Sequence, residues 1–328
     1  MKDIRYLPYK VARKAYLSVF QGPEYQPDDQ TLDNPDSVSD LIRGMIEQGA
    51  PCMISRFGST ELSCVCNYLA ITGRTGSLLS YIKGQSSAWW WQESIKAQMQ
   101  AWSGFFPSNE SALTEFCKLT LQDAQEVDLL GSWLQQESHI QTLNKSLIKT
   151  RLLFLDPFWA KTPWTSALEG KKVIIVHPFK QTIEAQYKKR KLLHREGVLP
   201  PFDLKVIQAV QSLGGESEYT SWFDALNAMK EQLDNTDFDI ALIGCGAYGM
   251  PLAAHVKRMG KIGIHIGGSL QLLFGICGKR WENPEYGAEL RSLHPQIIYS
   301  DLANKDWVRP MRAETPTTST KVEDSCYW

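Results

Sequence analysis

The chain has 328 residues, of which 43% are hydrophobic and 22% charged, and its formal net charge is −1. Because positive and negative charges nearly balance, the protein has no overall electrostatic field that would attract nucleic acid. Any anion must therefore be recognised by a local group of side chains or backbone N–H groups. No apolar run reaches the ~18 residues of a membrane span and no signal peptide is evident, so we expect a cytoplasmic protein. The seven cysteines lack a disulfide framework or zinc-ligand spacing, which predicts free thiols.

The first 35 residues are expected to form a basic arm followed by a linker. Five cations alternate with tyrosines and aliphatic residues at helical spacing: Lys2, Arg5, Lys10, Arg13 and Lys14. Such an amphipathic helix either packs on its own domain, the simpler interpretation, or docks peripherally at the inner face of a membrane. The polar, proline-containing stretch 21–35 then serves as the linker.

A helix and a strand-to-helix turn follow the linker. Apolar residues from Val38 to Ile46 recur at helical spacing, with Asp36 and Ser37 as expected N-caps and Gly49 as the stop. Residues 52–57 are expected to form a buried strand that Gly58 ends, and helical spacing resumes after it. Such a turn lies at the carboxyl end of a strand, where open α/β sheets bind their ligands.

The stretch between residues 70 and 165 is less regular. Three adjacent tryptophans, residues 89–91, precede Trp102, Phe105 and Phe106; core packing is the simpler interpretation, and stacking on a sugar ring is the alternative. We expect residues 110–148 to be helical with a break near Gly131. Residues 152–155 are expected to form a short strand that ends at Asp156.

From residue 172 onward, strands alternate with helices. The expected strands are 172–176, 204–210, 239–243 and 261–266, and the expected helices are 182–193, 221–233 and 250–259. This alternation predicts an α/β fold with a Rossmann-like, mostly parallel sheet covered by helices on both faces. The α/β domain spans residues 36–310, with a division into two lobes near residue 165 left open. Residues 311–328 are polar and are expected to be a disordered tail.

A second strand-to-helix turn contains Gly244, Gly246 and Gly249, which match the GxGxxG spacing of dinucleotide-binding turns. The end of the next strand and the residues after it include His265 and Gly267 but no carboxylate. An NAD or S-adenosylmethionine site needs a carboxylate there to bind the ribose, although either cofactor remains an alternative. The small residues of this turn would let a phosphate approach the backbone N–H groups at the start of the helix. Ala247 and Tyr248 lie within the turn and are candidate ligand contacts. The alternative is that the glycines serve only close packing.

Polar side chains with the chemistry for a phosphorylated ligand gather at these turns. Arg56 could clamp a phosphate, Ser59 could donate a hydrogen bond, and Glu61 could bind a cation or a sugar hydroxyl. Each also has a structural interpretation as an ion pair, an N-cap or a helix-dipole partner. His177 and His265 end predicted strands. Lys180 and the basic run 188–191 could stabilise a leaving diphosphate, although the run is more simply a solvated helix face.

Several segments resemble the GT-D glycosyltransferases. The hexapeptide RFGSTE, residues 56–61, is similar to their R-x-G-D-x-E segment, and residues 243–268 are similar to their late glycine-rich turn. Four segments also resemble GT-D-like proteins of bacterial capsule clusters: SGFFPSN (103–109), KKVIIVHPF (171–179), the GCGAYG helix and FGICGKRW (274–281). The resemblance covers about residues 36–309.

The resemblance implies a glycosyltransferase that binds a nucleotide sugar and a surface-polysaccharide or lipid-linked glycan acceptor. In that family the DxE carboxylates are associated with a divalent metal, Mg²⁺ or Mn²⁺. Here Ser59 replaces the first acid, so Glu61 is the only carboxylate of the pair and would bind metal more weakly. Glu61 or Asp156 would lie near the acceptor hydroxyl as the catalytic carboxylate. A non-catalytic nucleotide- or glycan-binding subunit is the alternative that loss of the paired acid permits.

Overall fold

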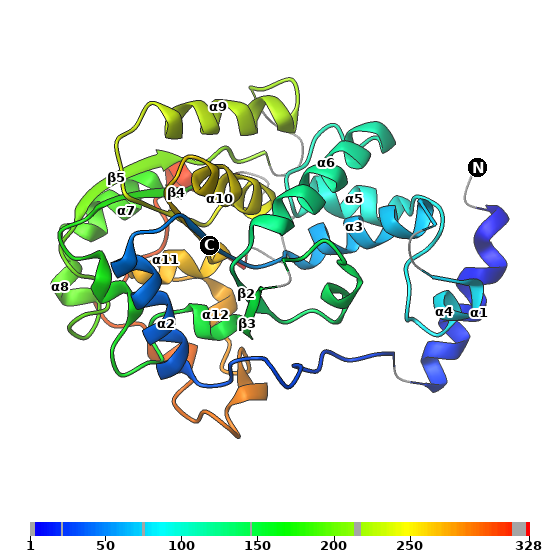
Figure 1. Cartoon of the computed structure of the whole chain (residues 1–328), viewed down its shortest axis with the longest axis horizontal. Coiled ribbons are helices and arrows are strands. Elements are labelled where there is room, and N and C mark those ends of the chain that lie inside the picture. Colours follow the sequence, from blue (N-terminus) through cyan, green and yellow to red (C-terminus); the bar gives the residue numbers. More distant parts are fainter. Residues whose placement is uncertain (1–3, 21, 74–75, 145, 213–217, 317–325) are drawn as a thin grey trace.

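The protein is built on one sheet of seven parallel strands, in the order β3-β2-β1-β7-β6-β4-β5. Figure 1 shows the whole chain. The computed structural model describes residues 4–20, 22–73, 76–144, 146–212, 218–316 and 326–328. The strands are β1 (Cys52–Ser55), β2 (Leu129–Ser132), β3 (Ile148–Arg151), β4 (Lys172–His177), β5 (Asp203–Gln208), β6 (Ile240–Ile243) and β7 (Ile262–His265). The predicted parallel α/β sheet is therefore confirmed.

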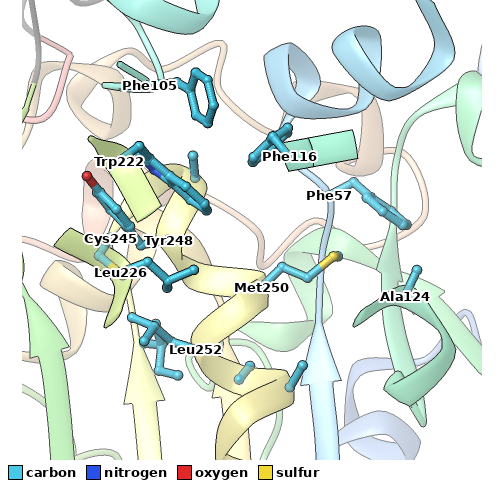
Figure 2. Packing of buried hydrophobic residues seen from close by; sticks show 14 of the residues in the cluster. Phe57, Phe105, Phe116, Ala124, Trp222, Leu226, Cys245, Tyr248, Met250 and Leu252 are labelled. Atoms are coloured by element: carbon cyan, nitrogen blue, oxygen red, sulfur yellow. The ribbon is translucent and has the colours of Figure 1, made fainter. Parts of the chain in front are cut away.

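Helices cover both faces of this sheet because both faces are apolar. Successive strand residues point to opposite sides; in β4, Ile174 belongs to one hydrophobic cluster and Ile175 to the other. Figure 2 shows part of the first cluster, in which Trp222 stacks on Tyr248 with ring centroids 4.9 Å apart. The helices that contribute to the first cluster are α3 (Ser59–Ile71), α5 (Glu93–Ala101), α6 (Glu110–Asp123), α9 (Trp222–Asp234) and α10 (Gly249–Arg258). Those of the second are α2 (Pro35–Gln48), α7 (Lys180–Tyr187), α8 (Arg190–Leu193), α11 (Leu270–Leu273) and α12 (Lys279–Glu282).

The strand order brings distant segments of the chain to one edge of the sheet. β7 pairs with β1 on one side and with β6 on the other, so strands from both sides of residue 165 belong to a single sheet. Because all strands are parallel, the carboxyl ends of β1, β7, β6 and β4 form a continuous row. The two strand-to-helix turns meet at this edge with only the end of β7 between them.

Two predictions before residue 165 were wrong. The stretch 110–148 is not one broken helix, since α6 ends at Asp123 and the strands β2 and β3 follow. Gly131 lies inside β2, where an added Cβ would come within 2.5 Å of Leu155 Cδ1. The predicted strand 152–155 is instead the 3-10 helix η4 (Leu152–Leu155), directly after β3. Asp156 therefore ends a helical turn and not a strand.

Smaller differences concern the ends of elements. Helix α2 is capped by Asn34, whose side-chain oxygen accepts from the Ser37 N–H at 3.0 Å, and not by Asp36 or Ser37. Gly49 ends this helix with φ +69°, as predicted. The predicted helix 182–193 is divided into α7 and α8. β1 ends at Ser55, so Arg56 lies in the turn itself.

The N-terminal arm forms a small unit of its own. Helix α1 (Leu7–Val19) lies beside α4 (Leu78–Ile82) at the margin of the molecule (Figure 1). Tyr6 stacks on the buried Trp90 with ring centroids 4.0 Å apart. This contact supports the packing interpretation of the arm, whereas Lys2 lies outside the described residues. None of the described helices is long and apolar enough to cross a bilayer.

The predicted disordered tail is packed at both of its described ends. The carboxylate of Glu314 accepts from the backbone N–H of Gln181 at 2.6 Å and of Thr182 at 3.2 Å. Tyr327 lies so close to Gly268 that a side chain there would collide with its ring. Residues 317–325 lie outside the described part of the chain. All seven cysteines are free, as predicted.

Candidate active site

A cavity of about 760 Å³ opens at the carboxyl edge of the sheet, over the ends of β1, β7, β6 and β4. Both strand-to-helix turns border it, so segments nearly two hundred residues apart share one cavity. Ten of the thirteen residues singled out from the sequence line it: Arg56, Gly58, Ser59, Glu61, His177, Gly244, Gly246, Tyr248, His265 and Gly267. This volume is in the range of small-molecule sites.

Arg56 is one of three arginines that line the cavity, with Arg151 and Arg280. Its guanidinium lies 5.1 Å from the ring centroid of Trp133, in cation–π geometry. The Nε atom is buried and has no hydrogen-bond partner among the described residues. A buried charged donor without a partner is costly, which indicates a position held ready for an anionic ligand. On its other side Arg56 packs near Gly267, where a φ of +75° favours glycine.

The loop that presents Trp133 is held by a buried carboxylate. Glu137 accepts from the backbone N–H of Trp133 at 3.0 Å and of Leu134 at 3.1 Å, and it also accepts from the Ser132 hydroxyl. Burial raises the pKa of Glu137, and these hydrogen bonds lower it again. Trp133 Nε1 donates to the Phe57 carbonyl at 3.0 Å. The indole ring is therefore fixed from both sides beneath Arg56.

Glu61 lies folded back against Gly58 in the first turn of α3, and any side chain at residue 58 would collide with its carboxylate. No donor among the described residues holds this carboxylate. The neighbouring Ser59 supplies only a hydroxyl. Among the described residues there is no cluster of three or more His, Cys, Asp or Glu side chains that could hold a metal. The donor set at this turn thus does not fit a divalent cation held by the protein alone.

Both predicted strand-end histidines are buried at the cavity and neutral at pH 7. Burial lowers the pKa of His177 to about 3; for His265 burial and the nearby Arg56 charge do the same. The Nδ1 atom of His177 accepts from the Phe179 N–H at 3.1 Å, so the ring proton is on Nε2. Ser55 Oγ lies 3.2 Å from His265 Nδ1. His177 can therefore donate a hydrogen bond to a ligand without carrying charge.

The three glycines of the second turn have different structural roles. A Cβ on Gly244 would lie 2.6 Å from the Gly267 carbonyl oxygen, and one on Gly249 would collide with the His265 ring. These two positions fit the packing alternative. Gly246 has φ +58° and no atom within 4 Å of where its Cβ would be. Only Gly246 thus leaves the backbone open toward the cavity, as a phosphate-approach site needs.

Three predicted site residues do not line the cavity. Ala247 is buried in the first hydrophobic cluster, and Lys180 lines a separate cavity bordered by α7, β5 and α9. Asp156 is buried behind the wall, where it accepts a hydrogen bond from the Tyr299 hydroxyl. Burial raises its pKa to about 6, although hydrogen bonds from Tyr299 and Ser269 and the Arg56 charge each lower it in part. Asp156 therefore has no direct access to an acceptor hydroxyl.

The cavity also contains side chains that sequence reasoning missed. Trp133, Arg280, Tyr327 and Trp328 all line it, as does Trp102, for which the sequence left sugar stacking open as the alternative to core packing. The Arg280 guanidinium lies 4.8 Å from the Tyr327 ring centroid and donates to its hydroxyl at 3.2 Å. Trp133 directly follows β2, so recognition of that strand would have placed it at the ligand-binding edge of the sheet. Tyr327 and Trp328 form an aromatic pair after a polar stretch, and this pattern could have indicated that the end of the chain packs on the domain. None of the adjacent tryptophans 89–91 lines the cavity.

Comparison with known families gives one match. The family model of the GT-D-like family, described as a GT-D fold-like domain, matches residues 33–273. The match spans all seven strands and both turns, whereas the cavity residues Arg280, Tyr327 and Trp328 lie beyond it. Searches of curated proteins and of solved structures found no match.

Proposed function

The chain belongs to the GT-D-like family, and on that premise we propose that it transfers a sugar from a nucleoside-diphosphate donor to a glycan hydroxyl. The acceptor in this proposal is a surface polysaccharide or a lipid-linked glycan. The observation that carries it is the pairing, in one cavity, of a buried Arg56 donor without a partner and a Glu61 carboxylate without a partner. A cation and a base are the two groups that this reaction requires.

In the proposed reaction the acceptor oxygen forms a bond to the anomeric carbon, and the bond from that carbon to the β-phosphate oxygen breaks. The electron pair leaves with the nucleoside diphosphate. The Arg56 guanidinium and the His177 Nε2–H stabilise the developing negative charge, because both are fixed before the substrate binds. Glu61 accepts the proton of the acceptor hydroxyl.

Calorimetric titration with UDP-, GDP- and CMP-sugars, followed by a donor-hydrolysis assay, tests the proposal. Each titration is run with Mn²⁺ and with EDTA. Binding in EDTA is expected, because the chain supplies a single carboxylate at the turn and its phosphate contacts come from Arg56 and backbone N–H groups. Failure of every nucleotide sugar to bind under both conditions would falsify the proposal.

Two variants separate binding from chemistry. R56Q is expected to weaken donor binding by about 30- to 100-fold, since it removes a charge-assisted hydrogen bond. E61Q is expected to bind donor within about threefold of the native protein but to lose roughly a hundredfold or more in turnover. K180Q is the matched control, because Lys180 is a cation outside the cavity. An equal effect of K180Q and R56Q would contradict the assignment of Arg56.

A binding subunit without catalytic activity is the second candidate. The specific observation that favours it is Ser59, which stands where the resembling glycosyltransferases have the first acid of their DxE pair. The same titration distinguishes the two functions. Donor binding without hydrolysis or transfer to any glycan acceptor would identify the subunit, whereas turnover that depends on Glu61 would identify the transferase.

A further inference from the structure

The exposed apolar side chains of this protein are concentrated in one place. We define the N-terminal unit as residues 4–20 and 77–90, which share a small hydrophobic core around Tyr81 and Trp90. Among the described residues, twelve large hydrophobic side chains are exposed. Eight belong to the N-terminal unit: Ile4, Leu7, Val11, Val19, Phe20, Leu78, Leu79 and Trp89. Scattered exposed side chains need no explanation, but a concentration of this kind marks an interaction surface.

The same unit carries charge of one sign only. Its sequence contains five basic residues, Arg5, Lys10, Arg13, Lys14 and Lys83, and no Asp or Glu. Over the whole chain the two signs balance, with 35 basic and 36 acidic residues. The absence of acids from this unit is therefore local, and it matches a partner surface that is negatively charged.

The two faces of α1 are used differently. On the inner face, Tyr6 stacks on Trp90, and Arg13 donates to the carbonyls of Tyr81 and of Ser86, the latter at 2.9 Å. The outer face presents Leu7 and Val11, one helical turn apart and 55% and 58% exposed. None of the residues of α1 is fully buried. Half of this helix thus has no protein partner within the described structure.

We propose that the N-terminal unit is a docking surface for an anionic lipid bilayer. Apolar side chains flanked by cations suit the boundary between headgroups and acyl chains, where leucine, valine and tryptophan insert and lysine and arginine meet anionic lipid. A second copy of this chain is a poorer occupant, because it would bring the exposed cations Arg5 and Lys14 against the same cations of the first copy. The helix lies on the bilayer and does not span it, since α1 has only 13 residues.

The unit is fixed to the helix that starts at the cavity. The side chain of Asn67 in α3 donates to the carbonyls of Ala88 at 2.7 Å and Trp90 at 2.9 Å and accepts from the Gln92 N–H at 3.1 Å. The first turn of α3 borders the cavity. Docking would therefore hold the cavity at a set position relative to the lipid surface. This inference does not depend on the proposed reaction.

Flotation of the full chain with phosphatidylcholine vesicles, with and without phosphatidylglycerol, tests the proposal. We expect binding only to vesicles that contain phosphatidylglycerol, and we expect added salt to weaken it. R5Q/K14Q should weaken binding about 30-fold, from the loss of two charges at the surface. L7S/V11S should weaken it about 100-fold, because two apolar side chains no longer insert. All four positions are exposed in the folded chain, so folding should be retained.

K188Q/K191Q is the matched control, since these exposed lysines belong to a basic run on a different part of the molecule. It should float like the native chain. Absence of binding to phosphatidylglycerol vesicles, or an equal loss in the control, would overturn the proposal. So would light scattering that shows a dimer abolished by L7S/V11S, because the surface would then pair two copies. No sugar nucleotide is present, so the outcome is independent of transferase activity.

Discussion

Asp156 shows how a residue can matter to the cavity without lining it. Its carboxyl group is buried, accepts from Tyr299 and lies in the electrostatic field of Arg56. Burial raises its pKa from the usual value of 3.8 to about 6. At neutral pH the group is ionised at a cost in folding free energy, which hydrogen bonds from Tyr299 and Ser269 and the Arg56 charge offset only in part. Asp156 is thus a buried carboxyl group behind the cavity wall, held there by Tyr299.

The replacement D156N tests this assignment through the pH dependence of stability. The folded pKa of the carboxyl is higher than the unfolded one, so its contribution to stability is largest below pH 3.8 and is lost as pH rises through 6. Relative to D156N, the native protein should lose about 2.4 kcal/mol of unfolding free energy between pH 4 and pH 7. Urea unfolding of both proteins measures this difference. D301N serves as control, because Asp301 is exposed. If the difference in unfolding free energy between the native protein and D156N stays constant with pH, the assignment is contradicted.

At the residue scale, the sequence predicted cavity residues well where polar side chains lie next to a glycine that ends a strand. Arg56, Ser59 and Glu61 surround the chain-breaking Gly58, and all four residues line the cavity. Trp133 and Tyr327 could not be found in this way, because they reach the cavity through contacts with residues far away in the chain. Asp156 was misjudged because its position rested on a strand that is a 3-10 helix.

Among the elements, the second strand-to-helix turn contains a matched pair of glycines. Gly244 is packed against the turn that follows β7, with the Gly267 carbonyl oxygen 2.6 Å and Leu270 Cβ 3.0 Å from an added Cβ. Gly246 has open space but a positive φ. The first is therefore required by its neighbours and the second by its own backbone.

Replacement of each glycine by alanine separates these two requirements. G244A should lose roughly 1–3 kcal/mol of unfolding free energy, because a backbone oxygen cannot move aside as a flexible side chain can. G246A should lose about 1 kcal/mol, the cost of a left-handed conformation for alanine. Urea midpoints at constant m-value give both numbers. A larger loss for G246A than for G244A would show that the packing around Gly244 is misassigned.

Elements were predicted best where strands and helices alternate over a long stretch. From residue 172 onward each predicted strand exists, because its flanking helices and turns fix its ends. β2 was missed because it has four residues, is buried on both faces and contains Gly131. Such a strand has no polar alternation that would distinguish it from a buried helix. Its extended conformation is set by pairing with β1 and β3 in the sheet and not by its own sequence pattern.

For the molecule as a whole, two kinds of buried titratable group change the unfolding free energy in opposite directions as pH falls. Burial lowers the pKa of His177 and His265 to about 3 and of His194 to about 4. Each costs stability as pH falls below 6.5, because the unfolded chain binds a proton that the folded chain does not. Burial raises the pKa of Asp123 and Asp156 to about 6. Each of these adds stability as pH falls toward 4.

These two effects largely offset each other between pH 6 and pH 4. In that window three histidines are opposed by two aspartates, so the unfolded chain binds about one proton more than the folded chain, and the unfolding free energy should fall by about 1.4 kcal/mol per pH unit. Below pH 3.8 the aspartates are protonated in the unfolded chain as well, but His177 and His265 also take up protons, because their pKa is about 3. The slope should therefore not steepen near pH 4 and should decrease toward pH 3. Urea titrations at closely spaced pH values between 3 and 7 measure this slope, and a loss of about 4 kcal/mol per pH unit between pH 6 and pH 4 would mean that the aspartates do not oppose the three histidines.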